Sequence, residues 1–196
     1  MARNTRDLIY YGALEAFSEQ GFAATTMDYI AEKSGVVKRT LYYNFKTKED
    51  LFRYVIDRAV DELTNLLDTS LAKHKEFSRK WQHVIDTHCK YYQENTFFFH
   101  LLIQQMWKKD EASPFAIQEL FKGYFSRLDQ ELRNDQQAGY IDANLDIFTC
   151  SASVFGMMTI PAARAMLNNQ PIYTEERVQT ISNLILSSLE RMHEHE

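Results

Sequence analysis

Residues 25–51 read TTMDYIAEKSGVVKRTLYYNFKTKEDL, and this stretch decides the fold. The threonines at its start supply hydroxyl caps for a short helix. Gly35 ends that helix, because glycine tolerates the left-handed backbone conformation. Ala31 lies four residues before this glycine and lets two helices cross closely, while Leu41 lies six residues after it and fills the angle between them. The spacing predicts a helix-turn-helix, whose second helix enters the major groove of DNA.

The outward positions of that second helix suit contacts with DNA. Lys38 and Arg39 fall in its first turn, where base edges are contacted, and arginine can bind guanine through two hydrogen bonds. Hydroxyl and ammonium groups further on could bind phosphates. These candidate phosphate contacts are Thr40, Tyr42, Tyr43 and Lys48. The alternative is a solvated basic face on a purely structural pair of helices.

Composition and periodicity favour helices throughout the rest of the chain. Of 196 residues only 6 are glycine and 3 are proline, and no Asn-Gly or Asp-Gly pair marks a hairpin, which argues against an all-β fold. Hydrophobic residues make up 45%, which argues against disorder. Apolar spacing predicts helices over 7–20, 26–34, 37–45, 47–73, 77–94, 96–109, 114–137, 145–168 and 174–193. We expect a small basic N-terminal domain over 1–47 and a larger acidic, aromatic domain over 48–196.

The charge is unevenly distributed. The formal net charge is −5, but residues 33–48 carry five basic residues and no acid, which is the local feature that matters for binding phosphates. Cys89 and Cys150 form no disulfide framework, so a reducing compartment is the simpler interpretation. The longest uncharged run, 147–163, contains hydroxyl side chains and a proline, which disfavours a membrane span. We therefore expect a cytoplasmic protein without a membrane partner.

Residues 9–51 resemble the DNA-binding domain of the tetracycline-repressor (TetR) family of transcription regulators. The matching residues are Gly21-Phe22, Thr25-Thr26, Ile30-Ala31, Gly35-Val36, Thr40-Leu41-Tyr42, Phe45, Lys48-Glu49 and Leu51. The resemblance implies an all-α homodimer with an N-terminal three-helix helix-turn-helix domain that binds DNA. It also implies a C-terminal helical bundle for effector binding and dimerisation, in which the last two helices of each subunit form the interface. A small-molecule effector would release such a protein from its operator.

The resemblance also assigns roles by position and has two departures. It implies that Thr26 joins Tyr42, Tyr43 and Lys48 on phosphates, and that Lys38, Arg39 and Thr40 face bases. Where the family often has a capping serine, this chain has Val37, which could instead pack on a thymine methyl group. Where the family commonly has a small residue, this chain has Arg39, our first candidate for operator specificity.

Aromatic and aliphatic residues of the C-terminal part suggest an effector pocket and a dimer interface. The candidate pocket residues are Tyr92, Phe98, His100, Met106, Trp107, Phe121 and Phe125. An aromatic lining suits flat or cationic lipophilic ligands, but it does not separate them from an acyl chain. The candidate interface residues are Phe155, Val178, Ile181, Ile185 and Leu189. For both sets the alternative is ordinary packing within one subunit.

The sequence offers no catalytic motif and no metal site. A nucleophile elbow, a phosphate-binding loop, a dinucleotide fingerprint and a zinc-protease motif are all missing. His83 and His88 would lie about 140° apart around a helix and so would not converge on a metal. We expect neither an enzyme nor a cofactor. The predicted function is a ligand-responsive repressor of transcription that a small lipophilic effector releases from its operator; the alternative is an activator or an effector-independent DNA-binding protein.

Overall fold

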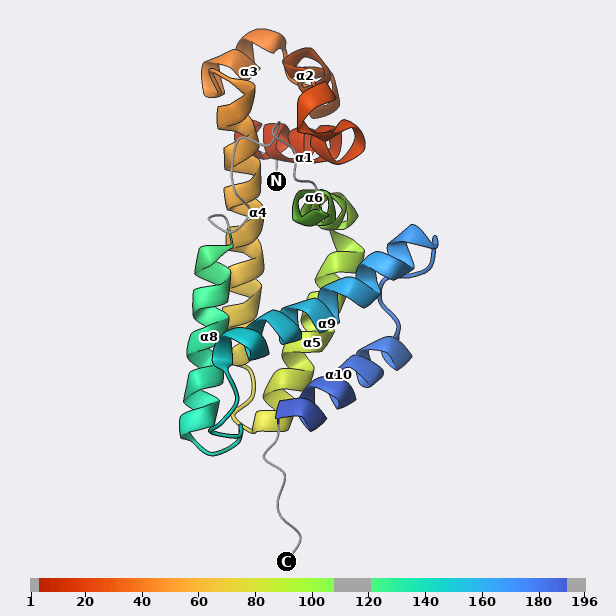
Figure 1. Ribbon diagram of the computed structural model, residues 1–196. Coiled ribbons are helices and arrows are strands. Elements are labelled where there is room, and N and C mark those ends of the chain that lie inside the picture. Colours follow the sequence, from red (N-terminus) through yellow and green to blue (C-terminus); the bar gives the residue numbers. More distant parts are fainter. Residues whose placement is uncertain (1–3, 108–120, 190–196) are drawn as a thin grey trace, which may run out of the picture. The chain divides into compact units, whose positions relative to one another are not determined.

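The computed structural model describes residues 4–107 and 121–189, and they form helices joined by short connections (Figure 1). The helices are α1 (Thr5–Ala24), α2 (Met27–Ser34), α3 (Lys38–Asn44), α4 (Lys48–Leu71), α5 (Phe77–Glu94), α6 (Thr96–Trp107), α8 (Lys122–Gln137), α9 (Ile147–Leu167) and α10 (Glu175–Leu189). The predicted all-α fold is confirmed. The first part of the helix expected over 114–137 lies outside the described residues.

Packing divides these helices into two compact units. The first contains α1, α2, α3, the part of α4 up to Asp61, and α6. The second contains α4 from Glu62 onward, α5, α8, α9 and α10. The boundary expected near residue 47 marks the start of α4, whereas the packing division falls inside that helix. Where the DNA-binding part ends as a functional domain stays a prediction.

The first unit is built on a close crossing of α1 and α2. A Cβ atom placed on Gly12 would lie 2.5 Å from the backbone nitrogen of Ser34, so only glycine fits between these helices. Phe17, Ile30 and Leu41 fill the space between the first three helices and are fully buried. At Gly21 the backbone has a φ of 75°, which ends the regular part of α1 where the sequence predicts a terminator.

The second unit packs α5 against α9 and α10, and α8 against α9. Its largest buried side chains are Trp81, Tyr92 and Tyr124. The Nζ atom of Lys80 lies 2.6 Å from carboxylate oxygens of both Glu131 and Asp135, so this buried lysine joins α5 to α8. A buried charge needs such partners, because removing an ion from water is costly when it is left unpaired.

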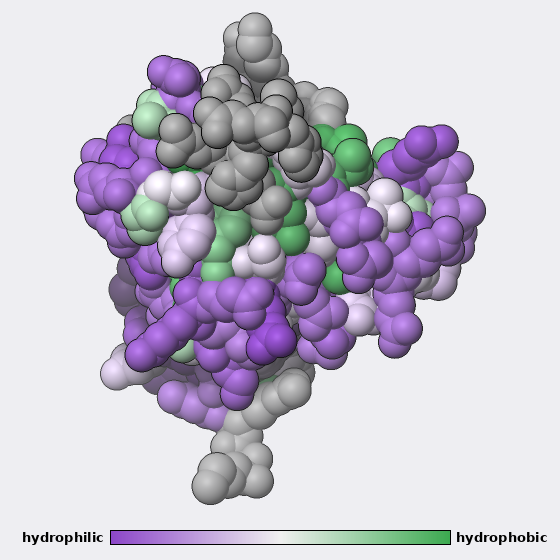
Figure 2. All heavy atoms as spheres, turned by 90° about the horizontal axis from the view of Figure 1, so that it is seen from below, coloured by the Kyte–Doolittle hydropathy of each residue, from purple (hydrophilic) through white to green (hydrophobic). Residues whose placement is uncertain are grey.

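Helix α9 is long and apolar enough to cross a membrane by length and composition, with a mean hydropathy of 1.2 over an 18-residue window. Half of that window is buried inside the protein, where α9 packs against α5, α8 and α10. A buried core helix therefore accounts for its apolar character. Over the face seen in Figure 2, hydrophilic residues predominate and hydrophobic ones gather in small patches.

Candidate nucleic-acid interface

The turn between α2 and α3 has the geometry that the sequence predicts. The hydroxyl of Thr26 accepts a hydrogen bond from the backbone N–H of Tyr29 at 3.2 Å and caps α2. Gly35 has a φ of 64° and ends this helix in the left-handed conformation. The N–H of Val36 then donates to the carbonyl of Ala31 at 3.1 Å. These bonds satisfy both ends of α2 and fix the direction in which α3 leaves.

Helix α3 buries Leu41 and leaves Thr40 and Asn44 half-buried, while its other residues are exposed. Tyr43 is 83% exposed and Val37, which precedes the helix, is 71% exposed. Within the described residues no side chain caps the N-terminus of α3, as expected from valine at this position. Arg39 is exposed and has no bonding partner among residues 4–107 and 121–189. Arg39 and Lys38 are thus accessible on α3, Thr40 is half-buried, and their role as base contacts stays a prediction.

Two lysines of the basic stretch, unlike Arg39, have carboxylate partners. Lys33 bonds to Glu15 at 2.6 Å and to Glu19 at 3.0 Å, so it joins α2 to α1. The hydrogen bonds that Lys33 donates to these two carboxylates raise its pKa. The ammonium of Lys38 lies 2.7 Å from a carboxylate oxygen of Asp28 on α2. The charge available to phosphates is therefore smaller than the count of basic residues suggests.

Lys48 has a structural contact that the sequence does not reveal. Its ammonium donates to the carbonyls of Phe22, Thr25 and Ala23 at 2.8, 2.9 and 3.2 Å. An ammonium group has three N–H donors, and these three carbonyls accept all of them. The structure thus gives Lys48 the role of capping the C-terminal end of α1, and a phosphate contact would require it to give up one of these bonds.

Arg6 is a candidate DNA contact that the sequence analysis missed. Its exposed guanidinium lies 5.7 Å from the ring centroid of Phe45, directly after α3, and 5.6 Å from that of Tyr54 on α4. Stacking on these rings would hold the positive charge beside the end of the recognition helix. An arginine in the first turn of α1 gives no sequence signal of this proximity.

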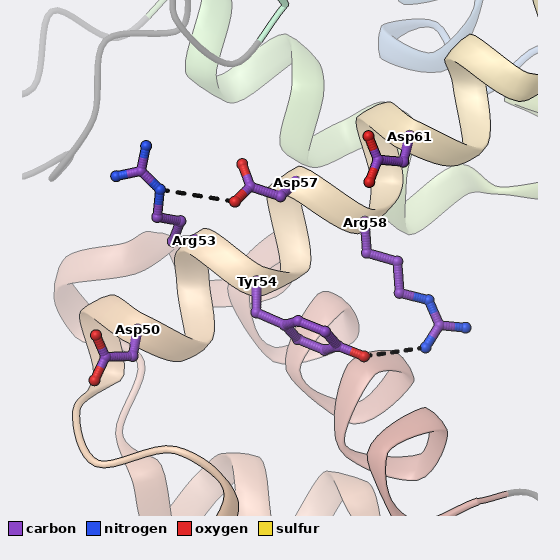
Figure 3. A pocket seen from close by; sticks show the side chains of 6 residues that line it. All are labelled: Asp50, Arg53, Tyr54, Asp57, Arg58 and Asp61. Atoms are coloured by element: carbon purple, nitrogen blue, oxygen red, sulfur yellow. Dashed lines mark hydrogen bonds and ion pairs between the residues drawn. The ribbon is translucent and has the colours of Figure 1, made fainter.

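A shallow hollow of about 480 Å³ lies along α4 and is the pocket shown in Figure 3. Its lining residues are Asp50, Arg53, Tyr54, Asp57, Arg58 and Asp61. Arg53 lies 3.7 Å from Asp57, and Arg58 donates to the hydroxyl of Tyr54 at 3.3 Å. Burial raises the pKa of Asp57. Because acids and arginines alternate on a single helix, the hollow is best described as a solvated, charge-paired face of α4.

Family models match nearly the whole chain. Residues 9–55 match the model of bacterial regulatory proteins of the tetR family, and residues 56–188 match the model of the C-terminal region of YsiA-like proteins. The chain belongs to the TetR family. This membership confirms the resemblance drawn from residues 9–51 and the prediction of a DNA-binding regulator of transcription.

Individual proteins that are similar to this chain agree with the family match. The uncharacterized HTH-type transcriptional regulator YhgD of Bacillus subtilis is 31% identical over 123 residues, which cover 58% of this chain and 64% of the relative. The fatty acid metabolism regulator protein of Bacillus subtilis is 22% identical over 177 residues, 90% of this chain and 91% of the relative. The crystal structure of FadR from Bacillus subtilis in complex with stearoyl-CoA matches with a TM-score of 0.82 at 20% identity, over 94% of this chain and 100% of that one. At this identity the structural likeness shows the shared fold.

The structure distributes the candidate effector residues over both units. Tyr92 and Phe125 belong to the second unit, where Tyr92 is fully buried and Phe125 packs 5.2 Å from the ring of Phe155. The candidates in the first unit are the buried Phe98 and Phe121 and the exposed His100 and Met106. The side chain of Trp107 lies outside the described residues. Their role as a pocket lining stays a prediction.

Most of the candidate interface residues are buried within the single chain. Phe155, Ile181, Ile185 and Leu189 are each at most 5% exposed, and Val178 is half-buried. They pack α10 and α9 into their own unit, which is the alternative left open by their spacing. Their role in a dimer interface stays a prediction.

Proposed function

We propose that this protein is a repressor that leaves its operator when a long-chain fatty acyl-CoA binds to its C-terminal part. The proposal rests on the names of two similar proteins that match along nearly the whole chain, including the C-terminal region at residues 56–188. A relative that matches along 90% of this chain is named for fatty acid metabolism, and a protein of the same fold is titled as a complex with stearoyl-CoA. An acyl-CoA also deepens the predicted class of a small lipophilic effector.

The second unit has an interior that suits an apolar ligand. Its aromatic side chains cluster, with the ring of Tyr124 at 5.7 Å from that of Phe155. Polar groups inside the cluster are paired with one another: Tyr124 and the Nε2 atom of His88 are 3.1 Å apart, and the hydroxyls of Tyr92 and Thr159 are 3.3 Å apart. Such surroundings suit the alkyl part of a ligand, because the rings are apolar and these polar groups already bond to one another.

The decisive experiment measures release of DNA. A duplex selected by the full-length protein from a random pool serves as the probe, and its binding is followed by fluorescence anisotropy during titration with stearoyl-CoA, free CoA or stearate. We expect stearoyl-CoA to release the DNA and free CoA to leave it bound. Thermal unfolding supplies an independent readout, since a ligand present at about 100 times its Kd stabilises by about 2.7 kcal/mol. If stearoyl-CoA neither releases the DNA nor raises the Tm, the effector class is wrong.

We also propose that the protein acts as a homodimer through the outer faces of α9 and α10. Phe148 and Leu167 on α9 are 76% and 75% exposed, and Leu184 on α10 is 55% exposed. Small residues, Ala152 and Ser153, are exposed between them on α9 and would allow another helix to approach closely. A dimer would place two recognition helices about 34 Å or a multiple apart along DNA.

Repression and activation differ in where the operator lies. A footprint that overlaps the promoter would support a repressor, because bound protein would exclude the polymerase. A footprint upstream of it, together with transcription that rises when the protein is added, would favour an activator. We also infer that the protein acts in the cytoplasm, where its operator would lie.

A further inference from the structure

An acidic residue lies at the DNA-facing end of the helix-turn-helix. Asp28 is in the first turn of α2, and its carboxylate oxygens lie 2.7 and 2.9 Å from the ammonium of Lys38 in the first turn of α3. Both side chains are largely exposed, at 65% for Asp28 and 59% for Lys38. The two helices that carry the DNA contacts are thus bridged by an ion pair on their outer side.

Stability gives a weak reason for this pair. An exposed ion pair contributes about 0–1 kcal/mol, because water and salt screen the attraction. An acid in the first turn favours a helix through its dipole, but Asp28 could do so without Lys38. Near DNA the same carboxylate is repelled by the phosphates, which are negative. The pair therefore calls for an explanation in terms of DNA binding.

We propose that Asp28 determines sequence specificity by positioning Lys38. The carboxylate holds the ammonium over the first turn of α3, where the remaining N–H group of Lys38 can reach an acceptor on a base edge, such as the O6 or N7 atom of guanine. At the same time the pair is neutral, so Lys38 adds little to attraction by phosphates of any sequence. Asp28 thus lowers non-specific binding while it preserves base contacts, and it acts through a neighbour rather than on a base itself.

The charge of neighbouring groups supports this assignment. The hydrogen bond that Lys38 donates to the Asp28 carboxylate raises the pKa of Lys38. On the same side of the motif Arg39 has no carboxylate partner in the described part of the chain. The first turn of α3 therefore presents one neutralised and one free positive charge. That difference predicts that the two residues contribute differently to salt dependence and to base preference.

The test uses the full-length protein and two DNA probes. One is a duplex selected by the wild type from a random pool, and the other is a scrambled duplex of the same length and composition. Affinities are measured over a series of salt concentrations for the wild type, Asp28→Asn and Asp28→Glu. Glu32→Gln is the matched control, since it removes an exposed acid one turn further along α2. Lys38→Gln and the double variant Asp28→Asn/Lys38→Gln complete a double-mutant cycle.

We expect Asp28→Asn to raise affinity for the scrambled duplex by roughly five- to tenfold at about 0.1 M salt, because one more phosphate contact steepens the salt slope by about 0.9. The ratio of selected to scrambled affinity falls, and a new selection by this variant shows a weaker preference at one base position. Asp28→Glu retains wild-type behaviour, and Glu32→Gln changes neither slope nor ratio. In the Lys38→Gln background, the effect of Asp28→Asn is lost.

Several results would overturn the proposal. An unchanged salt slope for Asp28→Asn would mean that the pair does not withhold charge from phosphates. An equal effect of Glu32→Gln would mean that only net charge matters. Persistence of the effect without Lys38 would mean that Asp28 acts on DNA directly. Unfolding curves of all variants ensure that these comparisons are made between folded proteins.

Discussion

Among single residues, Arg39 is the one whose removal should change which DNA is bound. It is exposed in the first turn of α3, and the described residues offer it no partner that would divert it from a base. We expect Arg39→Ala to relax base preference at one operator position by about 1–3 kcal/mol, the range for a lost bidentate contact with guanine. Selection from a random duplex pool measures this. Arg39→Lys is the control, because it keeps the positive charge but loses the paired N–H donors of the guanidinium. If Arg39→Ala instead weakens binding to all sequences equally, Arg39 contacts a phosphate.

Lys48 should affect stability rather than the salt dependence of DNA binding. Its three bonds to carbonyls cap the end of α1, and losing a cap of this kind costs about 1–2 kcal/mol. We expect Lys48→Met to lower the free energy of unfolding in urea by this amount and to leave the salt slope unchanged. Lys46→Met is the matched control, since Lys46 is exposed. A salt slope that falls by about 1 in Lys48→Met would restore the phosphate role implied by the family resemblance.

At the scale of elements, α5 and α8 are joined by a histidine that must stay neutral. Both ring nitrogens of His88 are engaged, with the carbonyl of Val84 at 2.8 Å and the hydroxyl of Tyr124 at 3.1 Å. Burial lowers the pKa of His88 to about 4, against the opposing effect of the bond to Val84. The unfolded chain binds a proton near pH 6.5, so the stability that His88 confers is complete above this pH and is lost as the pH falls toward 4.

We therefore expect acid to destabilise the protein through this residue. Between about pH 7 and pH 5 the free energy of unfolding should fall by about 2 kcal/mol from His88 alone, at about 1.4 kcal/mol for each pH unit below the unfolded pKa. Urea unfolding of the wild type and of His88→Gln at both pH values isolates this part. The variant should be less stable at pH 7 but less sensitive to pH. Equal pH sensitivity in the two proteins would place the acid response on other groups.

The sequence predicts the elements well because local signals set them. The helix expected over 77–94 is observed with these bounds, and the one expected over 145–168 is Ile147–Leu167. Glycines with left-handed backbone, Gly21 and Gly35, mark helix ends in both the sequence and the structure. The close approach at Gly12 escapes such reasoning, because it depends on which helix crosses α1 rather than on its own neighbours in sequence.

Contacts between distant residues limit what the sequence can predict about the site. The outward residues of α3 follow from helical periodicity, and the structure assembles them as expected. The bonds of Lys48 to the end of α1 and of Lys38 to Asp28 join residues from different helices, so no spacing reveals them. In the same way, an apolar stripe on α10 shows that Ile181 and Ile185 are buried but not which surface covers them. That choice belongs to the packing of the whole chain.

At the scale of the whole molecule, the outer faces of α9 and α10 should hold two copies together. We expect Phe148→Asp and Leu184→Asp each to shift the mass measured by light scattering from dimer toward monomer, because each places an unpaired charge in an apolar interface. Operator affinity should fall as the dimer dissociates, since separate monomers no longer bind the two half-sites together. Leu8→Asp is the control, as Leu8 is exposed on α1. A wild type that is monomeric both free and on DNA would contradict the proposed assembly.

The close contact between Gly12 and Ser34 limits how the helix-turn-helix can change during evolution. A methyl group on residue 12 would overlap the backbone of residue 34, at 2.5 Å from its nitrogen and 2.6 Å from its Cα atom. A lineage that acquires alanine here must therefore slide α2 along α1, and α3 moves with α2 because Gly35 joins them tightly. A substitution that touches no base can thus change which operator sequence the protein binds. Homologues in which residue 12 is not glycine should also carry compensating substitutions on the recognition helix.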